Sequence, residues 1–458
     1  MAPGGRSGPG WPAVAVLCLG VWLHAADSLL AATVMPSAVA EIGGIAFIYW
    51  TVAIYELGSI VAGAITGILA IRLGLRAAMM VAALIYGAGC TVSAIAPDMA
   101  AMLLGRLLQG LGGGWMMALS HVGVTQLFPA PRWPELLAVI SGVWGVSALT
   151  GPLIGGAFAT AGLWRGAFWA FAVQALALAA LMPMLLERTS GTVRRAESVP
   201  WGRITVLSAG VVAVLTAGVQ ASSLAALTLV GLGLLLLATA LALERRRNQL
   251  FPPDPLNLRR PWGAGYAMVL ALSIATVSFT VYGPLLMETL YGVTPLVAGF
   301  MIAIESVSWT IAAIVFAGAG AHLEPALIRG GPAAITIGIA GLAWTMPLGP
   351  VAALVPWVVL LGAGFGMCWA FVMRRVVESV AESERERAAS SLPTIQLLGY
   401  ALGAALSGIV ANLYGLAADA PRGVVETAAF WVFAAFLPLA SAGVAAAWRL
   451  SRGTGSGS

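Results

Sequence analysis

Charged side chains are scarce in this sequence. Only 9% of the 458 residues are charged, whereas 60% are hydrophobic and the mean hydropathy is +0.95. A soluble domain needs far more polar surface, so this composition predicts an all-α integral membrane protein with many spans. All 23 basic residues are arginine, and they form no block suited to nucleic acid, so we expect no nucleic-acid partner.

Cysteine and histidine are also rare, with three residues of each. Cys18, Cys90 and Cys368 lie in separate apolar runs without a paired spacing, so neither a disulfide framework nor a metal site is predicted. The sequence has no metal-binding histidine motif and no Ser or Cys nucleophile paired with a base. An intramembrane enzyme that uses His24 and Asp27 is therefore a distant alternative, as is a non-transporting receptor.

Fourteen apolar segments are separated by proline, glycine and arginine clusters, and each has about the length that a tilted membrane-spanning helix needs. We expect the first to be a true span, because its apolar stretch is too long for a cleaved signal peptide. The predicted spans are 12–36, 46–71, 77–97, 100–126, 133–160, 164–187, 201–222, 224–243, 264–290, 295–318, 326–348, 351–376, 388–412 and 424–450.

Arginine positions orient this arrangement. With both termini cytoplasmic, the inner segments hold 20 of the 23 arginines. Only Arg165 and Arg422 fall in outer loops, and Arg106 lies within a span. Because inner loops of membrane proteins are enriched in arginine, this predicts a multi-pass protein of a cell membrane, most simply the bacterial cytoplasmic membrane.

The spans group as six, two and six. Residues 1–188 are predicted to form one six-helix bundle, and 263–450 a second. Between them, 189–262 supplies two polar loops and two extra helices, and 451–458 reads as a flexible tail. Paired six-helix halves are typical of transporters whose site lies between the halves near the membrane midplane.

Asp27 is the residue whose insertion into the membrane is expected to cost the most free energy in this arrangement. An ionised carboxylate near the middle of a span costs roughly 2.5–3.5 kcal/mol on insertion scales, so it needs a functional or structural reason. At 1.5 Å per residue, Asp27 lies ~13 Å inside Pro36 and Arg106 lies ~9 Å inside its own helix. The two are expected to form a proton-coupling pair that faces a central cavity. A static ion pair that orients the two helices is the alternative.

Two further polar residues share faces with this pair. His24 lies one turn before Asp27 and could relay protons, or be a neutral histidine that is hydrogen-bonded inside the bundle. Gln109 lies one turn after Arg106 and could line the cavity or bond to a neighbouring backbone.

Glu56 and Glu305 lie in the middle of the second and tenth spans. They could be additional protonation sites or counter-charges for a cationic substrate. They could equally be protonated acids that are hydrogen-bonded at the interface between the halves.

Large aromatic side chains are spread over several spans. Those expected to form an adaptable pocket for a small amphiphilic substrate or lipid, together with Gln109, are Trp115, Trp144, Tyr282, Trp309 and Trp369. Most large apolar side chains in such a protein instead face membrane lipids or other helices.

Small residues mark the fifth span. Gly151, Pro152, Gly155 and Gly156 give this helix a bend and a groove that another backbone can approach closely. Generic helix packing would explain the glycines alone, but not the complete GPxxGG pattern.

Several stretches, in chain order, resemble the major facilitator superfamily, and specifically its fourteen-helix drug:proton antiporter branch. The matching stretches are 27–36, 50–55, 67–76, 106–110, 151–156, 164–168, 284–288 and 292–299.

This resemblance implies two bundles, no cofactor beyond the proton gradient, and a monomer. It assigns 151–156 as the antiporter motif, which forms a tight outer seal and favours export. It also assigns Gly67, Arg72, Gly74 and Arg76 to a cytoplasmic gate loop. Because Ile71 replaces the usual acid, the gate is expected to differ from that of relatives.

The expected function is proton-coupled export of amphiphilic, drug-like compounds by alternating access. A lipid or glycolipid exporter and a proton symporter are alternatives on the same fold.

Overall fold

The computed structural model describes residues 10–186, 201–220, 222–247, 251–252, 254–255, 257–320, 322–417 and 419–452. The predicted loop at 188–200 and nearly all of the predicted tail lie outside these residues. The helices are α1 (Trp11–Ile42), α2 (Ile48–Leu73), α3 (Leu75–Ala94), α4 (Met99–Leu127), α5 (Trp133–Thr160), α6 (Trp164–Leu185), α7 (Trp201–Ala217), α8 (Ser223–Arg247), α9 (Pro261–Tyr291), α10 (Pro295–Phe316), α11 (Glu324–Thr345), α12 (Val355–Glu378), α13 (Arg385–Leu413), α14 (Arg422–Ala434) and α15 (Leu437–Arg452).

Twelve stretches of the described chain are helical, long and apolar enough to cross a membrane, with α14 and α15 counted together. The chain is therefore an all-helical, multi-pass membrane protein. Neither α4 nor α7 is among the twelve. Helix α7 has only 17 residues, and α4 carries Arg106, Gln109 and several glycines, which lower its hydropathy.

Most helices end within a few residues of the predicted spans, but two predictions are wrong. Helix α1 does not end at Pro36 but continues to Ile42. A proline removes one backbone donor, and a membrane helix tolerates this loss when its neighbours cover the freed carbonyl. The last predicted span, 424–450, is divided into α14 and α15, and Pro438 lies in the first turn of α15, where a proline is readily accepted.

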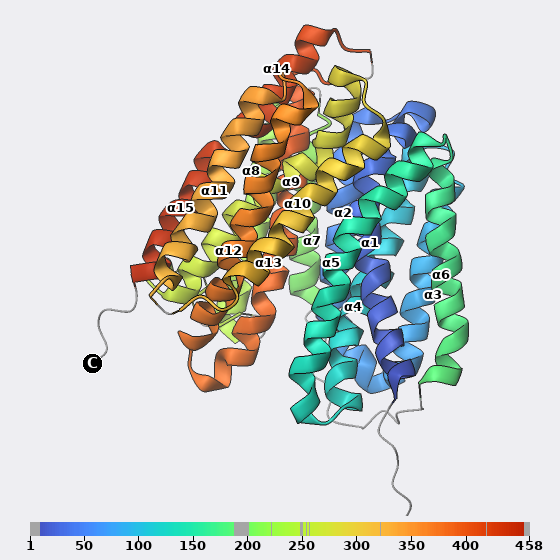
Figure 1. The fold of residues 1–458 in the computed structure, drawn as a ribbon, viewed down its shortest axis with the longest axis vertical. Coiled ribbons are helices and arrows are strands. Elements are labelled where there is room, and N and C mark those ends of the chain that lie inside the picture. The colour runs from blue at the N-terminus through green and yellow to red at the C-terminus, as the bar shows by residue number, and fades with distance from the viewer. Residues whose placement is uncertain are drawn as a thin grey trace, which may run out of the picture.

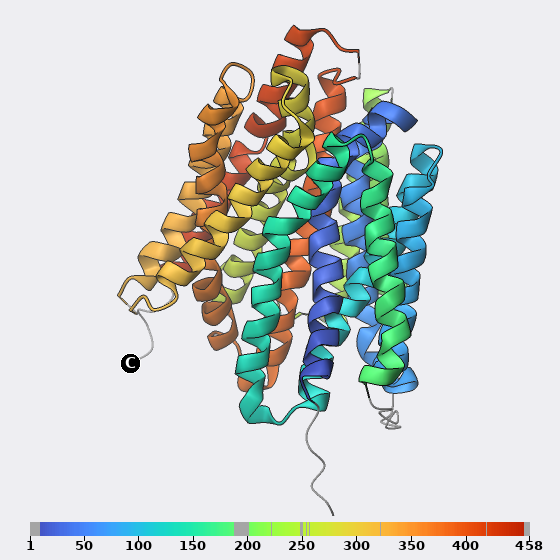
Figure 2. The ribbon, with the colours of Figure 1, turned by 45° about the vertical axis from the view of Figure 1, so that its right-hand side comes forward.

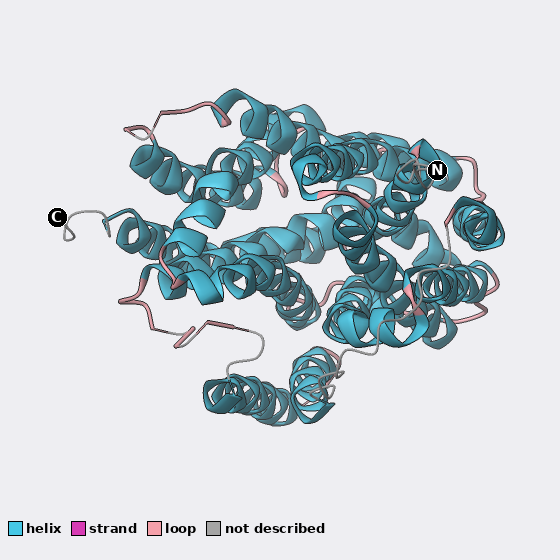
Figure 3. Ribbon diagram, turned by 90° about the horizontal axis from the view of Figure 1, so that it is seen from below, coloured by secondary structure: helices cyan, strands magenta, loops and turns pink. Residues whose placement is uncertain are grey.

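Two helical bundles lie side by side, α1–α6 in one and α9–α15 in the other (Figure 1). Helices α7 and α8 pack mainly on each other, and α7 also contacts α2 and α13. In the view along the helices, one helix pair stands apart from the rest (Figure 3). The inserted pair thus lies beside the seam between the bundles and leaves each bundle complete.

The bundles meet along α5 with α10 and along α2 with α13. We call the end where α1 begins and α15 ends the basal end, and the opposite end the distal end. Helices α5 and α10 lie together at the distal end and separate toward the basal end (Figures 1 and 2). At the distal end, the Leu296 backbone N–H donates to Thr160 Oγ1 (3.1 Å) and Asn412 Nδ2 donates to the Ala46 carbonyl (3.1 Å). The distal end is therefore closed by contacts between the bundles.

Candidate functional site

The Asp27–Arg106 ion pair is the centre of a buried network. Arg106 Nη1 lies 3.1 Å from Asp27 Oδ2, and both side chains are fully buried. Gln109 Nε2 donates to both carboxylate oxygens, at 3.2 Å and 3.1 Å. Asp27 thus accepts three hydrogen bonds from α4. Three donors, two of them on an amide and one on a cation, thus face the carboxylate, and charge-assisted hydrogen bonds of this kind are the strongest that a buried carboxylate can form.

Arg106 is held on its other side by α2. Its Nε donates to the Thr51 carbonyl (3.1 Å), and its guanidinium carbon lies 4.2 Å from the Tyr55 ring centre. Its Nη2 is buried without a hydrogen-bond partner among the described residues. A cation over an aromatic face is attracted by the ring, so Tyr55 helps Asp27 to stabilise the Arg106 charge.

Gln109 does not line a cavity in this structure. Its Oε1 accepts from Ser93 Oγ (3.0 Å) and from Arg106 Nη1 (3.3 Å), and its side chain is fully buried. The network therefore joins α1, α2, α3 and α4 inside one bundle. This differs from the expectation that Asp27 and Arg106 face a space between the bundles.

His24 bonds to Tyr55 instead of Asp27. The Tyr55 hydroxyl lies 2.9 Å from the His24 carbonyl oxygen and 2.9 Å from His24 Nδ1. One hydroxyl has one proton, so it donates either to the carbonyl or to Nδ1, and the tautomer of the His24 ring decides which. The two rings stack with centres 5.5 Å apart, and Trp144 contacts His24 edge-on at 6.0 Å. His24 therefore reaches the ion pair through Tyr55.

Glu56 and Glu305 lie on opposite sides of the seam. Glu56 is buried on α2, and its Oε2 has no hydrogen-bond partner among the described residues. Glu305, on α10, is half-buried, and its carboxyl makes no hydrogen bond or ion pair within the described chain. Tyr400 of α13 is close enough to interact electrostatically with both, and its hydroxyl accepts from Gln396 Nε2 (3.1 Å). The seam thus holds two acids without partners around one tyrosine.

The predicted pocket aromatics fall into two groups. Trp115 and Tyr282 are buried, so they line no space open to solvent in this structure. Trp144, Trp309 and Trp369 are half-buried. The Trp309 ring stacks on Phe365 at 4.8 Å and lies 6.1 Å from Trp369. An aromatic surface therefore extends along α10 and α12 from the position of Glu305.

The glycines of the 151–156 motif face two different helices. A Cβ at Gly151 would lie 2.5 Å from the Ala26 carbonyl on α1, and one at Gly155 would lie 2.4 Å from Thr33 Oγ1. A Cβ at Gly156 would lie 2.8 Å from Leu296 on α10. The absence of side chains lets α5 touch α1 in its own bundle and α10 in the other.

The basal loops of the two bundles differ in charge. After α2, Gly74 adopts φ +73°, which favours glycine, and Arg76 donates to the Pro183 and Leu186 carbonyls of its own bundle. Gly67 and Ile71 lie in the last turns of α2, and Arg72 is exposed.

In the second bundle, Glu324 pairs with Arg374 and with Arg375, the latter at 3.0 Å. Arg374 and Arg375 of α12 thus form an ion cluster with Glu324 of α11.

Comparison with known proteins places this architecture in a family. The sequence pattern described as "Major Facilitator Superfamily" matches residues 17–373. The chain belongs to the Major Facilitator Superfamily. This superfamily member is a membrane transporter and not an enzyme. Within its described residues, no group of three or more His, Cys, Asp or Glu side chains could hold a metal ion.

Relatives extend over nearly all of this transporter. A "Probable multidrug-efflux transporter" of Mycobacterium tuberculosis (strain ATCC 25618 / H37Rv) is 31% identical over 454 residues, which cover 95% of this chain and 93% of that protein. An "Efflux pump" of Aspergillus brasiliensis is 25% identical and covers 87% of this chain and 73% of that protein. Among solved structures, a D-xylose-proton symporter has a TM-score of 0.67 at 18% identity and covers 96% of this chain and 97% of that one, which shows a shared fold.

Proposed function

We propose that this transporter exports amphiphilic, drug-like compounds in exchange for protons by alternating access. The similarity to efflux proteins over 95% of the chain supports the substrate class. The observation that carries proton coupling is the pair of acids without partners, Glu56 and Glu305, on opposite sides of the seam. An intramembrane carboxyl that forms no ion pair is costly when ionised, so it readily takes up a proton.

Glu305 is the first acceptor of the proton in this proposal. It is half-buried and lies beside the aromatic surface of Trp309 and Trp369, so one region can hold both a proton and an apolar substrate. Proton and substrate then compete, because a cationic amphiphile is attracted to the ionised acid but not to the protonated one. Such competition is the simplest basis for exchange.

Asp27 has a second role in this scheme. Its carboxylate is fully partnered and sealed, so no proton reaches it without movement of α1 against α4. Protonation would release Arg106 and Gln109, and would thereby loosen the contact between those helices. Protonation of Asp27 would therefore change how the helices of the first bundle pack. Tyr55, which contacts Arg106, and His24, which contacts Tyr55, would move with them.

We also infer fourteen spans, with α4 and α7 included. Helix α4 packs against α1, α2 and α3, so its polar residues face protein and not lipid. The enrichment of arginine in the loops at the basal end supports a cytoplasmic position for that end. The closed distal end corresponds to an inward-facing conformation of a monomer, sealed on the outside by the glycine contacts of α5 and α10.

A proteoliposome experiment tests the proposal. Purified protein is reconstituted, a pH gradient is imposed, and accumulation of a fluorescent lipophilic cation is measured together with reciprocal proton flux. The wild type should exchange the cation for protons, and Glu305→Gln should lose gradient-driven accumulation but keep substrate–substrate exchange. Flux that ignores the pH gradient would refute proton coupling. Uptake in the direction of the proton would identify a symporter, and selective movement of labelled lipid would identify a lipid exporter.

A further inference from the structure

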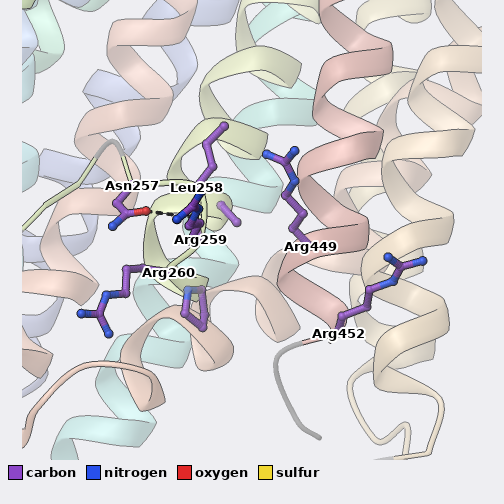
Figure 4. A pocket seen from close by; sticks show the side chains of 8 residues that line it. Asn257, Leu258, Arg259, Arg260, Arg449 and Arg452 are labelled. Carbon is purple, nitrogen blue, oxygen red and sulfur yellow. Dashed lines mark hydrogen bonds between the residues drawn. The ribbon is translucent and has the colours of Figure 1, made fainter. Parts of the chain in front are cut away.

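A cavity of about 650 Å³ lies at the basal end of the second bundle, remote from the charged network and the seam acids. Its walls are the turn that precedes α9 and the end of α15, and its charged lining is Arg259, Arg260, Arg449 and Arg452. Figure 4 shows Leu258 and Arg259 on one side and Arg449 on the other, and the Arg260 and Arg452 side chains point outward at the two edges. Four cations from two segments of the chain thus surround one hollow.

This charge is not neutralised within the described chain. No described carboxylate pairs with any of the four arginines, and no acid is among the residues that line the cavity. Helix α9 begins at the cavity wall, and its first-turn N–H groups add positive potential there. Guanidinium groups bind phosphate oxygens in a bidentate manner, so the site is chemically matched to a phosphate group.

Apolar side chains adjoin the same arginines. Leu258 is 40% exposed at the cavity wall, and Trp448, which is 44% exposed, lies under the Arg329 and Arg452 guanidinium groups at 4.3 Å and 5.6 Å. Arg329 also donates to Ser451 Oγ (2.7 Å). Exposed tryptophan and arginine at the ends of membrane-spanning helices mark the level of the lipid headgroups. A water-soluble phosphate compound has no apolar part that could contact Leu258 and Trp448. A phospholipid would cover these exposed side chains with its acyl chains.

We propose that this cavity binds the phosphate headgroup of an anionic phospholipid from the leaflet at the basal end. The arginines hold the phosphate, and the acyl chains lie along the exposed apolar surface of α15. Basic pockets between membrane helices at the cytoplasmic side bind anionic headgroups in this way. The site anchors the second bundle to one leaflet while the first bundle is free to move. The proposal does not depend on which compound is exported.

Lipid titration of the full chain tests this site. The purified protein in detergent is titrated with phosphatidylglycerol, with phosphatidylcholine of the same acyl chains, and with glycerol phosphate, and bound molecules are counted by native mass spectrometry. Phosphatidylglycerol should bind in preference to both other probes. The Arg449→Gln/Arg452→Gln variant should bind it roughly 25-fold more weakly, because each near-surface arginine contributes about fivefold.

The matched control is Arg72→Gln/Arg132→Gln, which removes two basal arginines from the first bundle and should leave phosphatidylglycerol binding unchanged. Equal losses in both double variants would overturn the site, since they would indicate a general charge effect. Equal binding of both lipids would also overturn it, and saturation by glycerol phosphate alone would overturn the lipid assignment. If the Gln variant does not fold, Arg449→Lys/Arg452→Lys replaces it and should show a partial loss, because lysine keeps the charge but not the bidentate geometry.

Discussion

The two groups of intramembrane acids differ in how well they are partnered. Asp27 accepts three hydrogen bonds from Arg106 and Gln109 and is sealed inside one bundle. Glu56 and Glu305 lie at the seam, and neither carboxyl forms an ion pair within the described chain. Removing one member of a buried ion pair leaves an uncompensated charge, but neutralising an acid without a partner removes a cost. Substitution should therefore lower stability at Asp27 and leave it unchanged or raise it at the seam acids, whereas gradient-driven transport should fall at both places.

The largest effect is expected for Asp27→Asn. The substitution leaves the Arg106 charge unpaired inside the bundle, so the free energy of unfolding should fall by about 3–5 kcal/mol and pH-driven export should be lost. Thermal melting in detergent and flux in proteoliposomes measure the two effects. Full gradient-driven export by the variant would remove Asp27 from coupling.

The double variant Asp27→Asn/Arg106→Gln is the control for folding. It removes both charges, so it should regain most of the lost thermal stability while export stays absent. If the double variant is no more stable than Asp27→Asn, then the two residues do not act as a pair.

A smaller change in stability but a clear change in transport is expected for Glu305→Gln. Because the carboxyl has no partner to lose, the melting temperature should stay the same or rise, while gradient-driven accumulation should fall about tenfold or more. A drop in melting temperature as large as that of Asp27→Asn would show that Glu305 has a structural partner.

Glu56→Gln should alter selectivity more than rate. If Glu56 is a counter-charge, then the variant should export a lipophilic cation several-fold more slowly and a neutral amphiphile of similar size at the wild-type rate. Transport assays with the two substrates in parallel decide this. Equal losses for both substrates would favour a coupling role shared with Glu305.

One added methyl group in the α5–α10 interface should weaken the contacts that close the distal end. A Cβ at Gly299 would lie 2.6 Å from the Pro152 carbonyl, so Gly299→Ala should destabilise the closed distal end by about 1–3 kcal/mol. The control is Gly145→Ala on the same α5–α10 interface, where the nearest atom would be 3.6 Å away. Labelling of a cysteine introduced at Thr160 by an impermeant reagent should increase only in the Gly299 variant; equal labelling in both would refute the seal.

The smallest effect is expected at the basal ion cluster. Glu324→Gln removes the partner of Arg374 and Arg375, and since Arg374 is partly exposed, the loss should be about 1 kcal/mol or less. Melting curves at low and high salt measure it, and the difference from wild type should shrink as salt screens the pair. A loss that does not depend on salt would contradict an electrostatic role.

Depth along a helix could be read from the sequence, but rotation about the helix could not. Matched depths brought Asp27 and Arg106 to the same level, where the structure joins them. Whether that level faces a cavity or the bundle interior depends on how four helices pack, and in this structure the pair lies in the bundle interior. The contact between Tyr55 of α2 and Arg106 of α4 could not be predicted either, because the two residues lie on different helices and meet only when these pack.

Contacts across the seam could not be predicted from the sequence, because they depend on how the two bundles pack. Tyr400 lies near two acids that come from α2 and α10, and nothing in its local pattern shows this. Glu324 was missed because its partners are fifty residues away on a neighbouring helix. The break between α14 and α15 does have a local signal in the sequence. Pro438 favours the start of a new helix, so one long span was not the only prediction that this segment allowed.

The distal end of α7 ties the two bundles together. Tyr49 of the first bundle donates to the Leu215 carbonyl (2.7 Å), and Asn412 of the second donates to the carbonyls of Gly218 (2.8 Å) and Ala46 (3.1 Å). Any movement that parts the bundles at this end must stretch or exchange these bonds, at about 0.5–1.5 kcal/mol each. The inserted pair thus adds to the number of hydrogen bonds that hold the two bundles together at the distal end, and it adds them through a helix that belongs to neither bundle.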